Sequence, residues 1–428
     1  MQVLWYIINN VITDANILIS LIVMLGLIVQ KKSASQVVIG MMKAFMGLII
    51  LGTGSGLMCG PINYLSPLLM KAFNIQGIVP MTTSVVAYAT QNYGSQVALI
   101  IVGSFAINLL LARITPFKYI FLSGHHYLYV ASAMTVGMAC AGVSGLPAII
   151  LGSIIAGCYY VLGPALDQPF MKNITGGQPL AMGHFGASGY WLAGQLGKLF
   201  SKDKDKSTED LKFPEGLGFL KETVCAVAIV MAIIMAVAVV AAGPGFLAEL
   251  GVTQSAITFV ITQGMTFGAG LTILLVGIRM LIAELLTAFE GIATKVIPNA
   301  LPALDCPVVF PYAPNAVMIG FISATVAGIL FSIVFAAITG TFVVPPMIEF
   351  FFMGGAGAVF GNSTGGVKGA ILGGAINGIL FIVLPYAYFA VCNNILGPLY
   401  TSVVDPDFCW AGMLSFALAN VLKTVGLR

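Results

Sequence analysis

Three histidines and one isolated aspartate are the side chains best suited to chemistry in this sequence. His125 and His126 follow Leu-Ser-Gly, His184 follows Met-Gly, and Asp305 is the only acid in the apolar run 296–348. Ionisable groups are costly in an apolar environment, so they usually face a cavity where they bind something. We therefore predict that His125, His184 and Asp305 line a polar site. The histidines would donate to oxygens of a bound molecule, and Asp305 would accept from its hydroxyls.

Each of these residues also has a structural interpretation. A histidine at a helix end can reach interfacial water, and we expect the side chain of His126 to point away from the site. Asp305 can cap a broken helix. We predict no metal site, because a metal needs three or more ligands at a defined geometry with supporting groups. No cofactor is expected, and the seven dispersed cysteines are interpreted as small buried apolar residues.

A glycine-rich run, Gly52-Thr53-Gly54-Ser55-Gly56, ends one predicted helix. Its glycines allow a backbone to approach a ligand closely, or two helices to pack closely. No lysine follows the run and no strand precedes it, so it is a weak phosphate-binding motif. The sequence also lacks an activated nucleophile pair and a nucleotide-binding loop, so we expect no intrinsic catalytic site.

The composition of the chain indicates what kind of structural elements hold these residues. Of 428 residues, 59% are hydrophobic and 8% are charged, and the mean hydropathy is +1.02. A soluble domain carries about 25% charged residues because its surface faces water, so lipid must cover this chain. The net charge of +3 is too small and scattered for nucleic acid. The N-terminus lacks a basic leader region, so the first apolar stretch is expected to stay as a spanning helix.

Apolar runs near 20 residues long predict the spanning helices of an all-α integral membrane protein. We expect about 10 or 11 of them, and the clean candidates are 11–30, 36–58, 95–112, 127–142, 146–164, 223–243, 256–280, 316–339, 367–391 and 408–425.

Four further apolar segments are too short or too interrupted to span: 62–90, 165–195, 292–315 and 342–364. Irregular backbone at membrane depth survives only where protein or a water-filled cavity satisfies it. We therefore predict re-entrant hairpins or broken helices, which build the substrate site in many transporters.

The two halves of the chain repeat each other weakly. Residues 85–92 resemble residues 308–315 at an offset of 223, and residues 151–157 resemble 372–378 at an offset of 221. This register pairs Thr82 and Thr83 with Asp305 and Cys306. Repeats of this kind, often inverted, place a transporter's site at the repeat interface, which adds Thr82 and Thr83 to the candidates.

The most polar segment, 201–222, holds 11 of the 33 Asp, Glu, Lys and Arg residues. It divides the chain into a first membrane half, 1–200, an aqueous loop, 201–222, and a second half, 223–428. Basic residues follow the first span, open this loop and close the chain, and the positive-inside rule places all three on the cytoplasmic side. We thus predict an N-terminus outside and a cytoplasmic C-terminus. The charged residues of 277–298 are expected to pair between helices or at the interface.

The same residues carry a resemblance to a known family. The chain resembles, across nearly its whole length, the membrane-embedded IIC component of the ascorbate-specific phosphoenolpyruvate-dependent phosphotransferase system (PTS). The most specific stretches are Gly277–Pro298, Ala303–Cys306 and Phe310–Val317, and others are Gly54–Gly56, Leu122–His125, Met182–His184 and Glu209–Pro214. The resemblance implies substrate contacts at Gly54, Thr82, His125, His184 and Asp305.

The resemblance also implies an assembly: a homodimer in the bacterial inner membrane, with scaffold and core domains that work as an elevator. Cytoplasmic IIA and IIB proteins would be its partners, and IIB would phosphorylate the solute. Three positions depart from the family pattern: Thr83 replaces a tyrosine, and Tyr129 and Phe185 replace glutamines. Two amide groups are therefore missing from the expected pocket, and a site built for hydroxyls is sensitive to such changes.

The leading hypothesis is a PTS permease for ascorbate or a similar polyhydroxylated solute. A secondary transporter driven by an ion gradient explains the broken helices and repeats equally well, and collapse of uptake on dissipating proton and sodium gradients would favour it. A non-transporting membrane receptor explains the loop, but it gives no role to buried histidines and an acid in broken helices.

Overall fold

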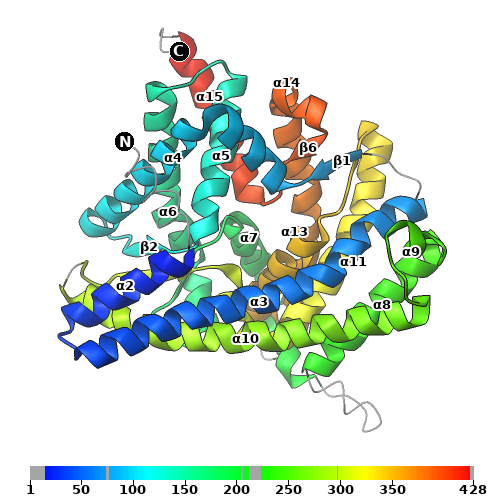
Figure 1. The fold of residues 1–428 in the computed structure, drawn as a ribbon, viewed down its shortest axis with the longest axis horizontal. Coiled ribbons are helices and arrows are strands. Elements are labelled where there is room, and N and C mark those ends of the chain that lie inside the picture. The colour runs from blue at the N-terminus through cyan, green and yellow to red at the C-terminus, as the bar shows by residue number, and fades with distance from the viewer. Residues whose placement is uncertain (1–14, 74–76, 204–205, 212–222, 296, 425–428) are drawn as a thin grey trace.

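The structure is a computed structural model that describes residues 15–73, 77–203, 206–211, 223–295 and 297–424, and its elements are mostly helices (Figure 1). The long and medium helices are α2 (Ala15–Val29), α3 (Ala34–Phe73), α4 (Thr82–Ile114), α5 (Gly124–Cys140), α6 (Leu146–Ile174), α7 (Ala187–Gly197), α8 (Thr223–Ala242), α10 (Ala256–Lys295), α11 (Pro314–Thr339), α13 (Gly355–Val391) and α15 (Pro406–Thr424). Short helices include α9 (Phe246–Glu249), α12 (Met347–Glu349) and α14 (Asn393–Leu396).

The helices agree with the expected spans. Each of the ten predicted runs overlaps one helix, although residues 11–14 and 425 lie outside the described residues. Six helical stretches of the described chain are long and apolar enough to cross a bilayer by themselves. An all-α membrane fold is therefore confirmed, with six such helices where about 10 or 11 spans were expected.

Helices α3 and α10 run side by side along one face of the molecule, with α2 and α8 against them (Figure 1). Glycines permit this close approach: a Cβ on Gly47 or Gly54 would overlap the α10 backbone, and one on Gly277 would overlap the α3 backbone. Lys43 and Glu284 form an ion pair of 3.3 Å between the two helices, as expected for charges in this region. The side chain of Glu290 lies outside the described residues.

Helix α13 is in fact a hairpin. Gly366 has φ 59° and ψ −149°, and the backbone of Gly361 faces that of Gly369 across the turn. Such a dihedral pair is open to glycine and strained for other residues. The predicted irregular segment 342–364 therefore supplies the first arm of this hairpin, which packs against α11 through Gly320 and Gly354.

In the described part of the chain, six short strands interrupt the helices: β1 (Gly77–Pro80), β2 (Tyr119–Phe121), β3 (Ala181–Met182), β4 (Leu301–Leu304), β5 (Phe342–Val343) and β6 (Thr401–Ser402). They form two parallel sheets, ordered β5-β1-β6 and β2-β4-β3. Each of the four predicted irregular segments contains one strand. Strand pairing thus satisfies the backbone groups that helices would otherwise satisfy inside the bilayer.

Two lysines, one near the C-terminus and one just before the central loop, lie at opposite ends of α6. Lys423 donates to the carbonyl of Ala141, just before α6 begins, whereas Lys198, next to the central loop, lies over the ring of Phe170 near the end of α6. The helix rises about 1.5 Å per residue, so roughly 36 Å of its length separates these contacts. These contacts place Lys423 and Lys198 near opposite ends of α6. The membrane side of the central loop and the orientation of the termini stay predictions.

The described part of the central loop is not simply a solvated connector. Glu209 accepts hydrogen bonds from the backbone N–H groups of Asn315 and Ala316 at the start of α11. Thr208 N–H donates to the Asn362 side chain at the α13 turn. Burial raises the pKa of Glu209 from its ordinary value, and hydrogen bonds from Thr208 and from the α11 backbone act against that rise. A carboxylate at a helix N-terminus is favourable because exposed N–H groups point at it.

Candidate functional site

The strand ends bring the predicted polar residues together. Asp305 directly follows β4, the central strand of its sheet, while Gly124-His125 and Gly183-His184 follow the flanking strands β2 and β3. Parallel strands end at the same edge of a sheet, so side chains far apart in sequence meet there. Asp305 lies at the N-terminal cap of a 3₁₀ helix, where its carboxylate accepts from the Cys306 N–H at 2.7 Å.

A cavity of about 480 Å³ opens at this edge, within the range of small-molecule sites. Helices α2, α3 and α10 form one wall, which is nearly all apolar: Asn16, Ile19, Leu48, Leu51, Gly52 and Leu281. The opposite wall carries the polar groups: His125, His126, Tyr129, His184, Asp305, Cys306, Glu349 and Asp405. The cavity therefore lies between two groups of helices, and one of the two supplies most of its chemistry.

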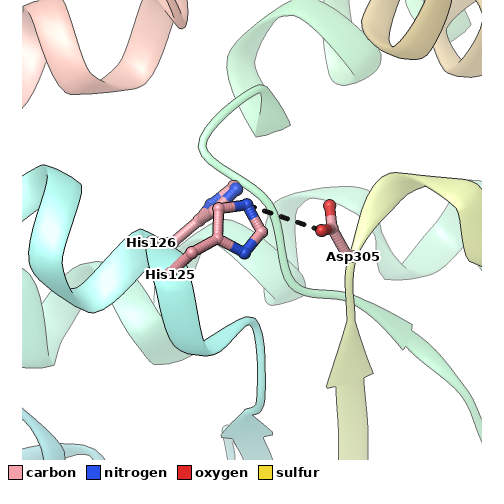
Figure 2. Close-up of side chains that lie close together, drawn as sticks. All are labelled: His125, His126 and Asp305. Carbon is pink, nitrogen blue, oxygen red and sulfur yellow. Dashed lines mark ion pairs between the residues drawn. The ribbon is translucent and has the colours of Figure 1, made fainter. Parts of the chain in front are cut away.

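Asp305 sits between two imidazoles. The His125 Nε2 lies 3.7 Å from one carboxylate oxygen and the His184 Nε2 lies 3.5 Å from the other. Figure 2 shows His125 and His126 at the start of α5 and the Asp305 carboxylate facing them from the end of β4. The distances are at or beyond the limit of a direct hydrogen bond. A solute hydroxyl placed here could donate to Asp305 and accept from an imidazole N–H at the same time.

His184 is held more tightly than His125. Its side chain is 6% exposed, against 48% for His125, and its Nδ1 lies 3.1 Å from the Tyr190 hydroxyl. His184 lies in the β3–α7 connection, outside the spanning helices. Burial lowers its pKa from the ordinary value to about 4, while the Asp305 charge acts in the opposite direction. The buried imidazole is therefore neutral near pH 7.

His126 is fully buried, and its Nδ1 accepts a hydrogen bond from the Phe185 N–H at 3.3 Å. That acceptor role leaves Nε2 as the protonated nitrogen of a neutral ring. Phe185 stacks between Tyr159 and Phe408 behind the cavity. Phe185 is not among the cavity-lining residues, so its backbone orients His126 while its ring supports the wall.

Two acids of the site were missed by the sequence analysis. Asp405 follows β6, and its carboxylate lies 4.0 Å from the His184 Nε2. Glu349 ends α12 and lines the same cavity. With Asp305, these carboxyls lie within electrostatic range of the Tyr129 hydroxyl. The repeat offset of 221 pairs Asp405 with His184, so extending the repeat past residue 378 would have found it.

Of the remaining predicted site residues, Thr82, Thr83 and Gly54 do not line the cavity. Tyr129 lines the cavity, but Thr82 is buried and its hydroxyl accepts from the Val404 N–H at 3.0 Å. Thr83 is exposed and lies outside the residues that line the cavity. Gly54 packs against the α10 backbone, two residues from Gly52, which does line the cavity.

Three overlapping triads of the site have ligand atoms close enough to approach one metal ion: His125, His126 and Asp305; His126, His184 and Asp405; and His184, Asp305 and Cys306. Two of them need His126, whose Nδ1 lone pair is used by Phe185 and whose Nε2 carries a proton. The third combines His184 and Asp305 with the buried Cys306 thiol.

Comparisons with known proteins indicate the family of this chain. A protein of Mycoplasma pneumoniae named "Ascorbate-specific PTS system EIIC component" is 26% identical over 443 residues, which cover 90% of this chain and 66% of the relative. The chain thus spans slightly less than two thirds of that relative's length. The sequence model of the family described as "PTS system sugar-specific permease component" matches residues 10–407. The chain therefore belongs to the family of sugar-specific permease (IIC) components of the phosphotransferase system.

Proposed function

We propose that this chain is a IIC permease that moves a small polyhydroxylated solute, with ascorbate as the first candidate, through the bacterial inner membrane. The observation that carries the proposal is the cavity in which Asp305 lies between His125 and His184. Family membership supplies the transport class, and the name of the Mycoplasma relative supplies the candidate solute.

The polar wall suits a solute with several hydroxyls. Carboxylates accept from hydroxyls, and neutral imidazoles donate through one nitrogen and accept through the other. Tyr129 adds a hydroxyl where the family pattern has an amide. The nearly apolar wall from α2, α3 and α10 would contact carbon faces of the solute. Thr82 and Gly54 act on this solute indirectly in our proposal, by holding the strand ends and the helix pair in place.

An elevator mechanism is part of this proposal. One group of helices, α2, α3, α8 and α10, would be the scaffold, and the group that carries the histidines and acids would be the moving core. The position of the cavity between the two groups supports this division. A slide of the core along the apolar wall would carry the polar residues with the solute. We also propose that scaffolds of two copies pair as a homodimer.

The sheet topology supports an internal repeat of 1–200 and 223–428 joined by the loop 201–222. The starts of β1, β2 and β3 precede those of β4, β5 and β6 by 224, 223 and 220 residues. The central strand of each sheet comes from one half and both flanking strands come from the other. Because each half contributes strands to both sheets, this arrangement would hold the two halves together at the site.

In the cytoplasm, a IIB protein recharged by a IIA protein would phosphorylate the solute. The test is uptake of radiolabelled solute into vesicles that contain phosphoenolpyruvate and the soluble PTS proteins, with and without IIB. We expect accumulation of the phosphorylated solute only with IIB. Accumulation without IIB that collapses when proton and sodium gradients are dissipated would overturn the proposal in favour of an ion-coupled transporter.

A further inference from the structure

The cavity wall has an unusual charge composition for a site that would bind an anion. Three carboxyls face it, from Asp305, Glu349 and Asp405, and among the described residues that line it there is no lysine or arginine. The described lining residues of α2, α3 and α10 add no titratable group. Among these described lining residues, a positive charge can come only from the three histidines.

The histidines can supply little of that charge. His126 uses its Nδ1 lone pair as an acceptor, which requires the neutral ring, and His184 is 6% exposed with the Tyr190 hydroxyl at its Nδ1. A buried imidazolium without full compensation is unfavourable. His125 is about half exposed and lies against the Asp305 carboxylate, so any positive charge there would be balanced by that carboxylate.

Within the described lining of the cavity, Glu349 and Asp405 then have no cation left to balance them. Each is either ionised, which makes the cavity negative, or protonated, which makes it neutral. In neither state does the wall attract an anion, whereas hydroxyl groups find acceptors and donors in both. Charges that face each other across a partly desolvated cavity interact strongly because the local dielectric is low.

We infer that this cavity takes its solute in an uncharged form, either a neutral polyhydroxylated molecule or the protonated form of an acid such as ascorbate. The inference rests on the proposed function and narrows its substrate class. Glu349 and Asp405 would be the residues that select against the anion. An acidic solute would enter together with its own proton.

The experiment is equilibrium binding to the purified full-length protein at pH 5.5, 6.5 and 7.5 under reducing conditions. Ascorbate is compared with L-galactono-1,4-lactone, which keeps the lactone ring and hydroxyls but lacks the acidic enediol. Because both are measured at each pH, changes in the protein's own protonation largely cancel in the ratio of affinities. We expect the ascorbate-to-lactone ratio to fall about tenfold per pH unit upward, since the uncharged fraction of the acid falls by that factor.

Two substitutions test whether Glu349 and Asp405 select against the anion. Glu349→Gln and Asp405→Asn should each raise the ascorbate-to-lactone ratio at pH 7.5 several-fold and flatten its pH dependence. A monodisperse elution profile and an unchanged thermal unfolding midpoint show that each variant is folded. Glu284→Gln is the matched control, because it neutralises an acid on α10 that pairs with Lys43 outside the cavity, and it should leave the ratio unchanged.

An ascorbate-to-lactone ratio of affinities that stays flat or rises from pH 5.5 to 7.5 would overturn the inference. The proposed function as a permease would still stand. Failure of ascorbate, the lactone and neutral polyols alike to bind would instead count against the proposed function, so the two failures are distinguishable.

Discussion

The two parallel sheets share one topology, but the ends of their central strands, β1 and β4, are used differently. In the β2-β4-β3 sheet, the ends deliver His125, Asp305 and His184 to the cavity. In the β5-β1-β6 sheet, the residue equivalent to Asp305 is Thr82, whose hydroxyl is used by the Val404 backbone. The same local architecture can therefore either expose polar groups to a solute or use them to hold strands together. Which use applies depends on what packs over the strand end.

The largest effect is expected at the end of β4, the central strand of the β2-β4-β3 sheet. Asp305→Ala removes the acceptor between the two imidazoles, and we expect at least about a 100-fold loss of solute binding, as for a charged group with several hydrogen bonds. Binding measured on monodisperse purified protein is the check. Near wild-type affinity in that variant would show that the close approach of Asp305 to the histidines has no role in recognition.

A second prediction compares two buried acids behind the sheets. Asp407 accepts from the Tyr159 hydroxyl and from the N–H and hydroxyl of Ser188, whereas both carboxyl oxygens of the fully buried Asp167 lack a hydrogen-bond partner among the described residues.

Asp407→Leu should lower the free energy of unfolding by about 3 kcal/mol, because it orphans three donors. Asp167→Leu should be neutral or stabilising, because it removes an unsatisfied polar group. Thermal unfolding in detergent ranks the two variants, and the reverse order would contradict the assigned hydrogen bonds.

The third prediction concerns the end of β1, the central strand of the β5-β1-β6 sheet. Thr82→Val keeps the shape but leaves the buried Val404 N–H without its acceptor, so stability should fall by about 1–3 kcal/mol. Solute affinity of the folded fraction should stay within about twofold, and Thr82→Ser, which keeps the hydroxyl, should restore most of the stability. A loss of affinity at unchanged stability would instead place Thr82 in direct contact with the solute.

The smallest effect is expected at Tyr129. Its hydroxyl faces the three carboxyls of the cavity, but its ring also packs edge-to-face on His125. Tyr129→Phe keeps the ring and removes one hydroxyl, so binding should weaken about three- to tenfold, in line with the loss of one net hydrogen bond. Tyr129→Ala should be worse than Tyr129→Phe; equal effects would assign the whole contribution to the hydroxyl.

The sequence by itself determined the membrane class, the positions of the helices and the residues able to do chemistry. Low charge and apolar runs require lipid, and the ten predicted spans overlap ten helices. His125, His184 and Asp305 stood out because ionisable groups are rare in such a chain. The repeat also paired Thr82 with Asp305 from sequence alone.

The tertiary structure decided which of these residues meet and which are used elsewhere. Gly54 contacts α10, Thr82 binds a backbone group, and Phe185 supports the wall, because helix packing and strand pairing bring distant segments against them. Glu349 joins the site for the same reason, and so does Asp405, which the sequence marks only through its repeat offset from His184. The ends of α6 likewise separate Lys423 from the central loop, which no count of basic residues along the chain could show.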